Sequence, residues 1–271
     1  MTEYESAHGS IVHIELNTDE IDATREFFGE AFGWEFEEYE DMAGYVGWRA
    51  PNPPNGGFMA PSEGPFSPPS TVFYIGVDDL AEANDAIADA GGEILVEDME
   101  VPGMGIFTMF QDPGGVINAA WEGRYEGEPP EGGWPMFTDE ATPGSIVHFE
   151  LYSDDPEATQ TFHEAVFGWE FEAAEGDYTM IRPPTPPSGG VMAANEQMPV
   201  GTLAYVLVES ASDACEMVEA AGGAVLREPF DIEGWGTMAV FEAPGGIVQA
   251  LWEAAPESMD ETGEAEPHAA S

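Results

Sequence analysis

Short apolar runs and amphipathic stretches alternate along the chain in a fixed order, which predicts the order of its strands and helices. A β-rich run at 10–16 is followed by a helix-like stretch at 19–32, with Thr18 or Asp19 as the expected N-cap and Gly33 as the expected end. Three strands are then predicted, at 34–40, 44–50 and 57–60. A second unit repeats this order of strand, helix and three strands, at 71–77, 79–90, 93–97, 105–110 and 116–121. The pattern therefore predicts a βαβββ unit taken twice.

The same pattern returns in the second half of the chain. The segment Gly9–Leu16 recurs as Gly144–Leu151 with one difference, and Phe32–Glu37 recurs unchanged as Phe167–Glu172. Such internal similarity predicts two copies of one domain, and therefore four modules. The expected boundaries are a first domain, a linker rich in Gly, Pro and Glu, a second domain and an acidic disordered tail, at 1–122, 123–143, 144–254 and 255–271.

The net charge of the chain limits the classes of partner it can bind and the salt conditions in which it is expected to fold. It contains 54 acidic residues against 5 cations, for a formal net charge of -49. Nucleic acid and anionic membranes need a cationic surface, so neither is an expected partner. Such self-repulsion calls for screening by salt, which favours a halophile's cytoplasm over an acidic mesophilic origin. The start of the chain is not that of a signal peptide, and no long apolar run occurs, so a cytoplasmic protein is expected.

Several motifs at matching places in the two copies carry a family resemblance. They are Val12–Leu16, the stretch from Phe27 to Trp34, the pair Gly91–Gly92, and Asp112–Gly115 before the last strand. With the nested βαβββ order, they resemble the vicinal oxygen chelate superfamily, which includes glyoxalase I, bleomycin-resistance proteins and extradiol dioxygenases. The resemblance implies an α+β fold with two tandem domains. Each domain would be a pair of modules forming a half-open cup, with a divalent metal inside on carboxylate and imidazole ligands.

The metal ligands that the resemblance implies are only partly present. The first strand supplies His13 and His148, whereas the positions of the other usual ligands carry Val72, Ala119, Leu203 and Ala250. Because residues i and i+2 of a strand share a face, Glu15 and Glu150 lie beside the two histidines. The candidate catalytic and metal-binding residues are therefore His13, Glu15, His148 and Glu150. Each His–Glu pair could instead orient a ligand and act as acid and base, or be purely structural.

Other side chains are expected to line the two cups. Alternation along the strands places six aromatic or methionine side chains on the cup face: Tyr74, Trp121, Met59, Tyr205, Trp252 and Met192. The alternative is that these side chains belong to the ordinary hydrophobic core. Arg49 and Arg182 recur at equivalent positions of the two copies. They are candidates for binding an anionic group of a ligand, or else they form salt bridges with nearby carboxylates.

These features lead to two functional hypotheses. The first is a glyoxalase-type lyase or a dioxygenase with a divalent metal on a non-standard ligand set. The second is a metal-free protein that binds or sequesters a small organic molecule, as bleomycin-resistance proteins do. In both, a small-molecule ligand is the expected partner, and the two domains pack as a pseudo-dimer within a monomer, or the chain forms a homodimer.

Overall fold

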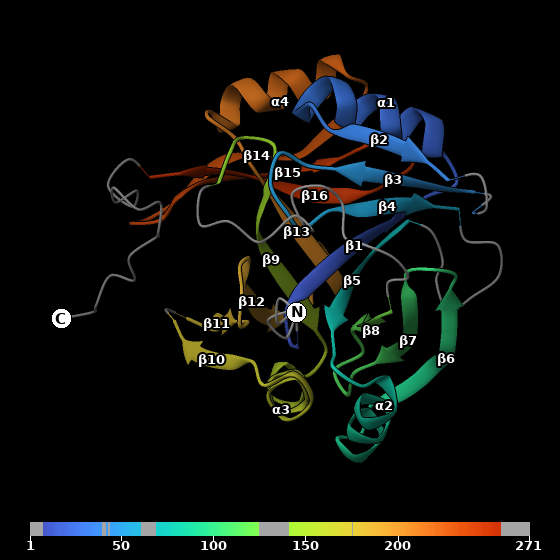
Figure 1. Ribbon diagram of the computed structural model, residues 1–271. Helices are drawn as coiled ribbons and strands as arrows, with labels where there is room; N and C mark the ends of the chain where they lie inside the picture. The colour runs from blue at the N-terminus through green and yellow to red at the C-terminus, as the bar shows by residue number, and fades with distance from the viewer. Residues whose placement is uncertain are drawn as a thin grey trace.

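The computed structural model describes residues 8–39, 42, 44–60, 69–124, 141–174 and 176–255, which form two eight-stranded sheets with helices (Figure 1). The elements of the N-terminal domain are β1 (Ile11–Asn17), α1 (Ile21–Phe32), β2 (Glu35–Glu38), β3 (Tyr45–Arg49), β4 (Gly56–Met59), β5 (Ser70–Gly76), α2 (Leu80–Asp89), β6 (Glu93–Val101), β7 (Gly105–Gln111) and β8 (Ile117–Gly123). Those of the C-terminal domain are β9 (Ile146–Ser153), α3 (Pro156–Phe167), β10 (Glu170–Ala173), β11 (Thr179–Arg182), β12 (Ser188–Ala193), β13 (Gly201–Leu207), α4 (Ala211–Ala220), β14 (Ala224–Ile232), β15 (Gly236–Glu242) and β16 (Val248–Ala254).

Each sheet joins two βαβββ modules through its central strands. The strand order is β2-β3-β4-β1-β5-β8-β7-β6 in the first domain, and the second domain repeats it. The central strands β1 and β5 are antiparallel to each other, and each is parallel to its neighbour on the other side, β4 for β1 and β8 for β5. The α+β fold with two tandem domains of paired modules is therefore confirmed.

The first helix begins differently from the sequence prediction. Its N-cap is Glu20, which makes no capping hydrogen bond through its side chain. Instead the Thr18 hydroxyl accepts a hydrogen bond from the Glu20 N–H at 3.1 Å. The helix ends as predicted, because Gly33 adopts a left-handed conformation with φ 69°.

The two faces of each sheet have different surroundings. One face packs against the helices and against the other domain, in a shared core that includes Ile14, Leu16, Phe73, Phe149 and Phe241. In this arrangement α1 lies beside α4 and α2 beside α3 (Figure 1). The opposite face of each sheet, here called the inner face, carries a separate apolar cluster in each domain.

Reciprocal hydrogen bonds tie the two domains together. The Trp34 indole donates to the Gly144 carbonyl at 2.8 Å, and the equivalent Trp169 indole donates to the Gly9 carbonyl at 2.6 Å. Both tryptophans are buried, so each hydrogen bond is shielded from water. The repeated domains are thus related like the two subunits of a dimer.

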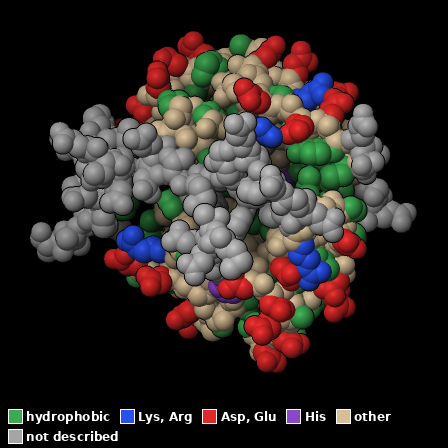
Figure 2. Space-filling model, in the orientation of Figure 1, with side chains coloured by type: hydrophobic (Ala, Val, Ile, Leu, Met, Phe, Trp, Pro, Cys, Tyr) green, Lys and Arg blue, Asp and Glu red, His purple; other side chains and the backbone are tan. Residues whose placement is uncertain are grey.

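Acidic side chains are spread over the visible surface, whereas few Lys or Arg side chains appear there (Figure 2). Within the described residues, no helix is long and apolar enough to cross a membrane. Most of the expected linker, at 123–143, and of the expected acidic tail, at 255–271, lies outside the described residues.

Candidate functional site

A polar cluster lies on the inner face of the N-terminal sheet. His13 Nε2 lies 3.2 Å from the Tyr45 hydroxyl, and the Tyr74 hydroxyl donates to Glu15 Oε2 at 3.1 Å. The rings of His13 and Tyr74 meet edge to face, with centroids 5.2 Å apart. His13, Glu15 and Asn17 alternate along β1, so they share this face while Ile14 and Leu16 enter the core.

The inner face of the C-terminal sheet carries a related cluster. His148 Nε2 lies 2.8 Å from the Tyr178 hydroxyl, and the rings of His148 and Tyr205 meet edge to face. The hydroxyl that donates to Glu150 Oε2, at 2.5 Å, belongs to Tyr152, two residues further along β9. The position equivalent to Tyr152 is Asn17 in the first domain, so the two clusters differ where the carboxylate is bound.

Burial controls the charges of both clusters. Desolvation lowers the pKa of His13 and of His148 to about 4, so both imidazoles are neutral at pH 7. Burial raises the pKa of Glu15, and the Asn17 and Tyr74 side chains oppose that effect. Burial likewise raises the pKa of Glu150, opposed by three tyrosines, first among them Tyr152. The inner faces therefore hold neutral imidazoles beside carboxyl groups whose ionisation is disfavoured.

Comparisons with known proteins agree with this architecture. Residues 10–119 match the model of the Glyoxalase/Bleomycin resistance protein/Dioxygenase superfamily, and residues 145–184 match that of the Bleomycin resistance protein-like N-terminal family. The Mn(II)-bound glyoxalase from Novosphingobium aromaticivorans has a similar structure, with a TM-score of 0.64 at 16% identity, over 97% of this chain and 95% of that one. Residues 10–119 thus match this superfamily, and the chain as a whole shares the two-domain fold of that glyoxalase.

Curated relatives match either the whole chain or about half of it. The proposed glyoxylase CFP32 of Mycobacterium tuberculosis is 28% identical over 262 residues, which cover 90% of this chain and 94% of that protein. The anthracycline biosynthesis protein DnrV of Streptomyces peucetius is 31% identical over 133 residues, which cover 41% of this chain and 47% of that protein.

The donor set of the two inner faces does not fit the divalent metal that the family resemblance implies. Val72 lies directly opposite Glu15, and Ala119 lies beside Tyr74 in the next strand, so neither neighbour of the His–Glu pair supplies a ligand. In the second domain Leu203 and Ala250 occupy the same places. Among the described residues, no group of three or more His, Cys, Asp or Glu side chains could hold a metal ion. Two donors per sheet are fewer than a stable site requires.

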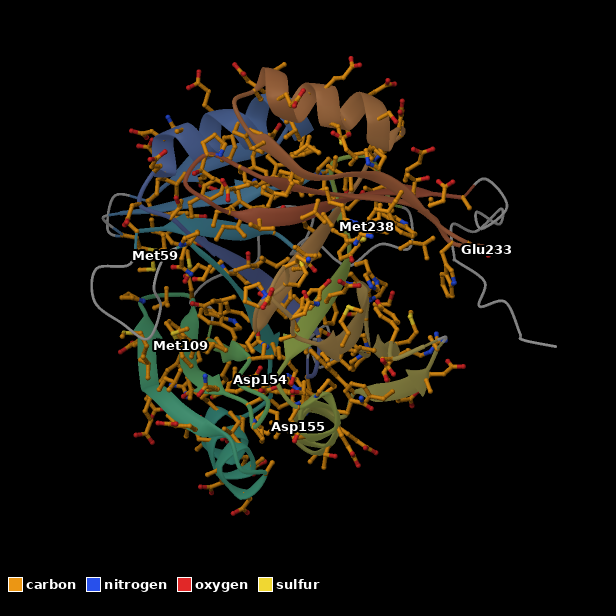
Figure 3. All side chains as sticks on the ribbon, turned by 180° about the vertical axis from the view of Figure 1, so that it is seen from behind. Met59, Met109, Asp154, Asp155, Glu233 and Met238 are labelled. Carbon is orange, nitrogen blue, oxygen red and sulfur yellow. The ribbon has the colours of Figure 1, made fainter. Side chains whose placement is uncertain are left out.

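The expected lining residues lie on the inner faces with unequal burial. Tyr74 packs with Phe107 and Trp121 in the N-terminal apolar cluster, and Trp252 and Met192 pack against the C-terminal one, which contains Tyr205. Met59 is 38% exposed. Met59 and Met109 come from the two halves of the N-terminal sheet, and Met238 from the C-terminal sheet (Figure 3).

The repeated arginines form exposed ion pairs. Arg49 lies 2.8 Å from Glu37, and Arg182 lies 2.8 Å from Glu172. The Arg49 side chain is 62% exposed. Of the two interpretations that the sequence left open, this geometry favours salt bridges on the outer strands over an anion site inside the cups.

Two tyrosines that contact the histidines were missed in the sequence. Tyr45 and Tyr178 recur at equivalent positions, four residues before Arg49 and Arg182, and this repetition is the signal that could have identified them. Asn17 follows His13 and Glu15 at the same two-residue spacing, and Tyr152 follows His148 and Glu150 in the same way. Reading the alternation to the end of the strand would have found them.

Tyr45 also borders a hollow of about 670 Å³ at the edge of the N-terminal sheet. The hollow lies between the start of α1 and strands β2–β4, and its lining includes Tyr39, Met42, Ala60 and four acidic side chains. A negatively charged ligand is disfavoured there, because these carboxylates would repel it.

Proposed function

We propose that the inner faces bind a small, neutral organic molecule without a metal ion. The observation that carries this proposal is that the hydroxyls of Tyr45 and Tyr74 contact His13 and Glu15, in surroundings where the described residues supply no further metal ligand. A few convergent polar groups in an apolar and aromatic setting are typical of small-molecule sites.

The surroundings favour an aromatic ligand. Tyr74, Phe107 and Trp121 meet edge to face or stacked, with centroid distances between 5.2 and 6.4 Å. Such rings contact planar apolar molecules well. The likeness to DnrV supports the same class of ligand, since its name places that protein in anthracycline biosynthesis.

A metal-assisted lyase is the second candidate, and the raised pKa of Glu15 and Glu150 is the observation that favours it. A carboxylate whose pKa is shifted toward neutrality is a better general base or acid than one in water. The Mn(II)-bound glyoxalase of the same fold supports this alternative. Here the chain would supply two ligands per domain, and the remaining coordination positions would be filled by water or substrate.

Titration with Mn²⁺ and with the neutral dye Nile red separates the two functions. Both are carried out after chelator treatment in about 1 M KCl, because carboxylates all over the surface would otherwise bind cations non-specifically. We expect fluorescence enhancement of the dye without stoichiometric Mn²⁺ binding by calorimetry. Trp121→Ala and Trp252→Ala should each weaken dye binding about fivefold at one inner face. Stoichiometric Mn²⁺ binding that is lost in His13→Gln/His148→Gln would favour the lyase instead.

A further inference from the structure

Three buried polar atoms on the N-terminal inner face have no hydrogen-bond partner. They are the amide oxygen and nitrogen of Asn17 and the hydroxyl of Ser70. The Asn17 side chain lowers the pKa of Glu15 as a hydrogen-bonding neighbour of its carboxylate, but this contact is not a well-formed hydrogen bond, and the Asn17 amide oxygen has no donor at all. Asn17 is only 1% exposed, so bulk water does not satisfy these atoms in place of protein groups.

The unpartnered atoms lie together. Asn17 and Ser70 are directly opposite each other in the antiparallel pairing of β1 with β5, so their side chains share the inner face. Glu15 is two residues before Asn17 on the same face, and its carboxylate accepts from Tyr74. Gln249 is another buried amide without partners, but its neighbours along the sheet belong to the shared core between the domains.

The fold does not require Asn and Ser at these two positions. The second domain has Tyr152 in place of Asn17 and Gly201 in place of Ser70, and these two residues also lie opposite each other. There the Tyr152 hydroxyl donates to Glu150, so that polar atom is satisfied within the protein. The first domain thus has unpartnered polar atoms at a position where the second domain has a hydroxyl that is hydrogen-bonded within the protein.

We propose that Asn17 and Ser70 form a polar subsite that binds a neutral carboxamide group, open-chain or lactam, of the ligand; this inference rests on the proposed function. A planar side-chain amide presents one donor and one acceptor side by side, which matches the acceptor and donor of a second amide. The Ser70 hydroxyl can donate or accept at the same place.

The charges around the subsite exclude an anionic ligand. Glu15 is the nearest ionisable group along β1, and the five arginines lie against other partners: Glu38, Glu37, Glu122, Glu172 and the Phe230 ring. A carboxylate or phosphate would therefore be buried without a counter-charge, which is strongly unfavourable. A neutral amide carries both hydrogen-bonding functions without that penalty.

Benzamide, benzoate and acetophenone test the proposal as probes of equal size. Binding is measured by ligand-observed saturation-transfer NMR in about 1 M KCl, alongside Nile red. We expect benzamide to bind at least tenfold more tightly than benzoate, which is charged, and than acetophenone, which lacks the donor. The double variant Asn17→Tyr/Ser70→Gly, which copies the second domain, should abolish that preference. Gln249→Leu, which removes a buried amide from the core, should leave it unchanged.

A stability measurement separates a ligand subsite from a structural role. Replacement of unpartnered polar atoms by a similar apolar side chain, as in Asn17→Leu, should raise the unfolding midpoint by about 2–4 °C. A structural role for Asn17 predicts a fall instead, and that result would overturn the proposal. The carboxamide subsite would also be overturned if the three probes bound equally, or if Asn17→Tyr/Ser70→Gly kept the preference for benzamide. In either case, binding of Nile red would leave the proposed function intact. If neither Nile red nor any probe bound, both would be wrong.

Discussion

A tyrosine can reach each inner-face histidine because glycine occupies the strand between them. Tyr45 lies on β3 and His13 on β1, and β4 runs between these strands. A Cβ atom added at Gly57 of β4 would overlap the Tyr45 ring, which shows that the ring lies across this glycine. Gly190 has the same relation to Tyr178 in the second domain. The missing side chain is therefore what allows each tyrosine to contact its histidine.

Substitution of these glycines should disconnect one cluster at a time. Gly57→Ala displaces the Tyr45 ring and admits water to His13, so its pKa should rise from about 4 toward 6.5, as followed by NMR of the imidazole protons. The cost in folding free energy should be about 1–3 kcal/mol, as for other overpacked sites. Gly190→Ala is the matched control, because it should raise the pKa of His148 and leave the pKa of His13 unchanged. If both histidines kept their pKa values in both variants, the glycines would not position the tyrosines.

The sequence predicted which residues share a face better than which residues meet. Alternation placed His13 beside Glu15, and the structure has both on the inner face of β1. The partner of His13 could not be found in the same way, because Tyr45 belongs to a strand that is not adjacent to β1. Such a contact depends on the register of three strands and on the space above Gly57, which appear only in the folded sheet.

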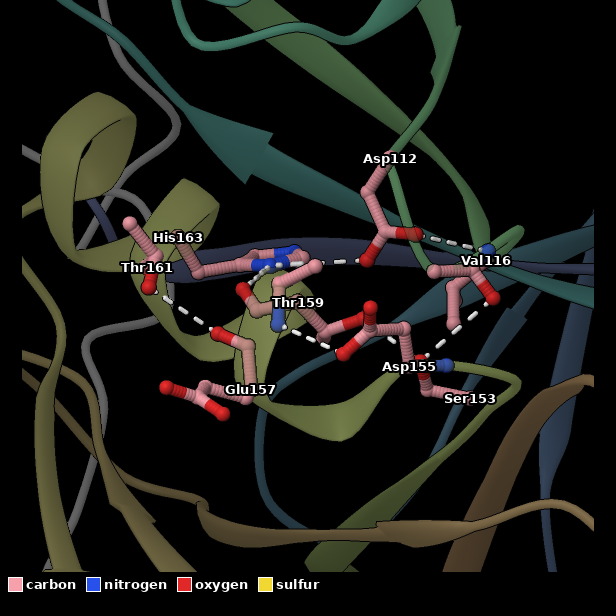
Figure 4. Close-up of polar contacts among 10 residues, drawn as sticks. Asp112, Val116, Ser153, Asp155, Glu157, Thr159, Thr161 and His163 are labelled. Carbon is pink, nitrogen blue, oxygen red and sulfur yellow. Dashed lines mark hydrogen bonds and ion pairs between the residues drawn. The ribbon is translucent and has the colours of Figure 1, made fainter.

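At the level of elements, helix α3 and the β7–β8 turn meet through a buried ionisable pair. His163 Nδ1 lies 3.8 Å from Asp112 Oδ2, and both side chains are 0% exposed (Figure 4). The imidazole Nδ1 also lies 3.0 Å from the Thr159 carbonyl, and Asp112 Oδ1 accepts from the Val116 N–H at 2.8 Å. The equivalent positions on the other side of the molecule carry Phe28 and Ala243, which are both buried. The domain interface is thus ionisable on one side and apolar on the other.

This asymmetry predicts how stability depends on pH. Burial lowers the pKa of His163 below the usual histidine value of 6.5, although Asp112 opposes the shift. Below pH 6.5 the unfolded chain therefore binds a proton that the folded protein excludes, and the free energy of unfolding falls as pH falls. His163→Phe/Asp112→Ala copies the apolar side, and it should remove up to about 1.4 kcal/mol per pH unit of that dependence.

The pH dependence is measured by chemical unfolding at several pH values below 7 in constant salt. His13 and His148 contribute a dependence of the same sign, since their pKa values are also lowered, whereas the raised pKa values of Glu15 and Glu150 contribute the opposite sign. All four groups remain in the variant, so the difference between the two proteins isolates the interface pair. Thr161→Ala, an exposed change on the same helix, is the control. An identical slope in the wild type and the double variant would contradict the prediction.

At the level of the whole molecule, the fold has to hold together against a net charge of -49. The ion pairs Arg25–Glu38, Arg49–Glu37 and Arg182–Glu172 are exposed, so they offset little of this repulsion. Stability must therefore come from the core that the two domains share, with screening by dissolved ions reducing the repulsion at the surface.

Dialysis against low salt tests whether the fold depends on this screening. The screening length is about 3 Å in 1 M salt and about 30 Å at 0.01 M, so carboxylates across much of one domain repel each other only in the dilute buffer. We expect the far-UV ellipticity to be retained in 1 M KCl and lost at 0.01 M, with recovery when KCl is restored. Sucrose, which stabilises compact states without screening charges, should restore much less of the signal than KCl. A native spectrum at 0.01 M would show that the core alone outweighs the repulsion, and the surface acids would then give no reason to infer a saline cytoplasm.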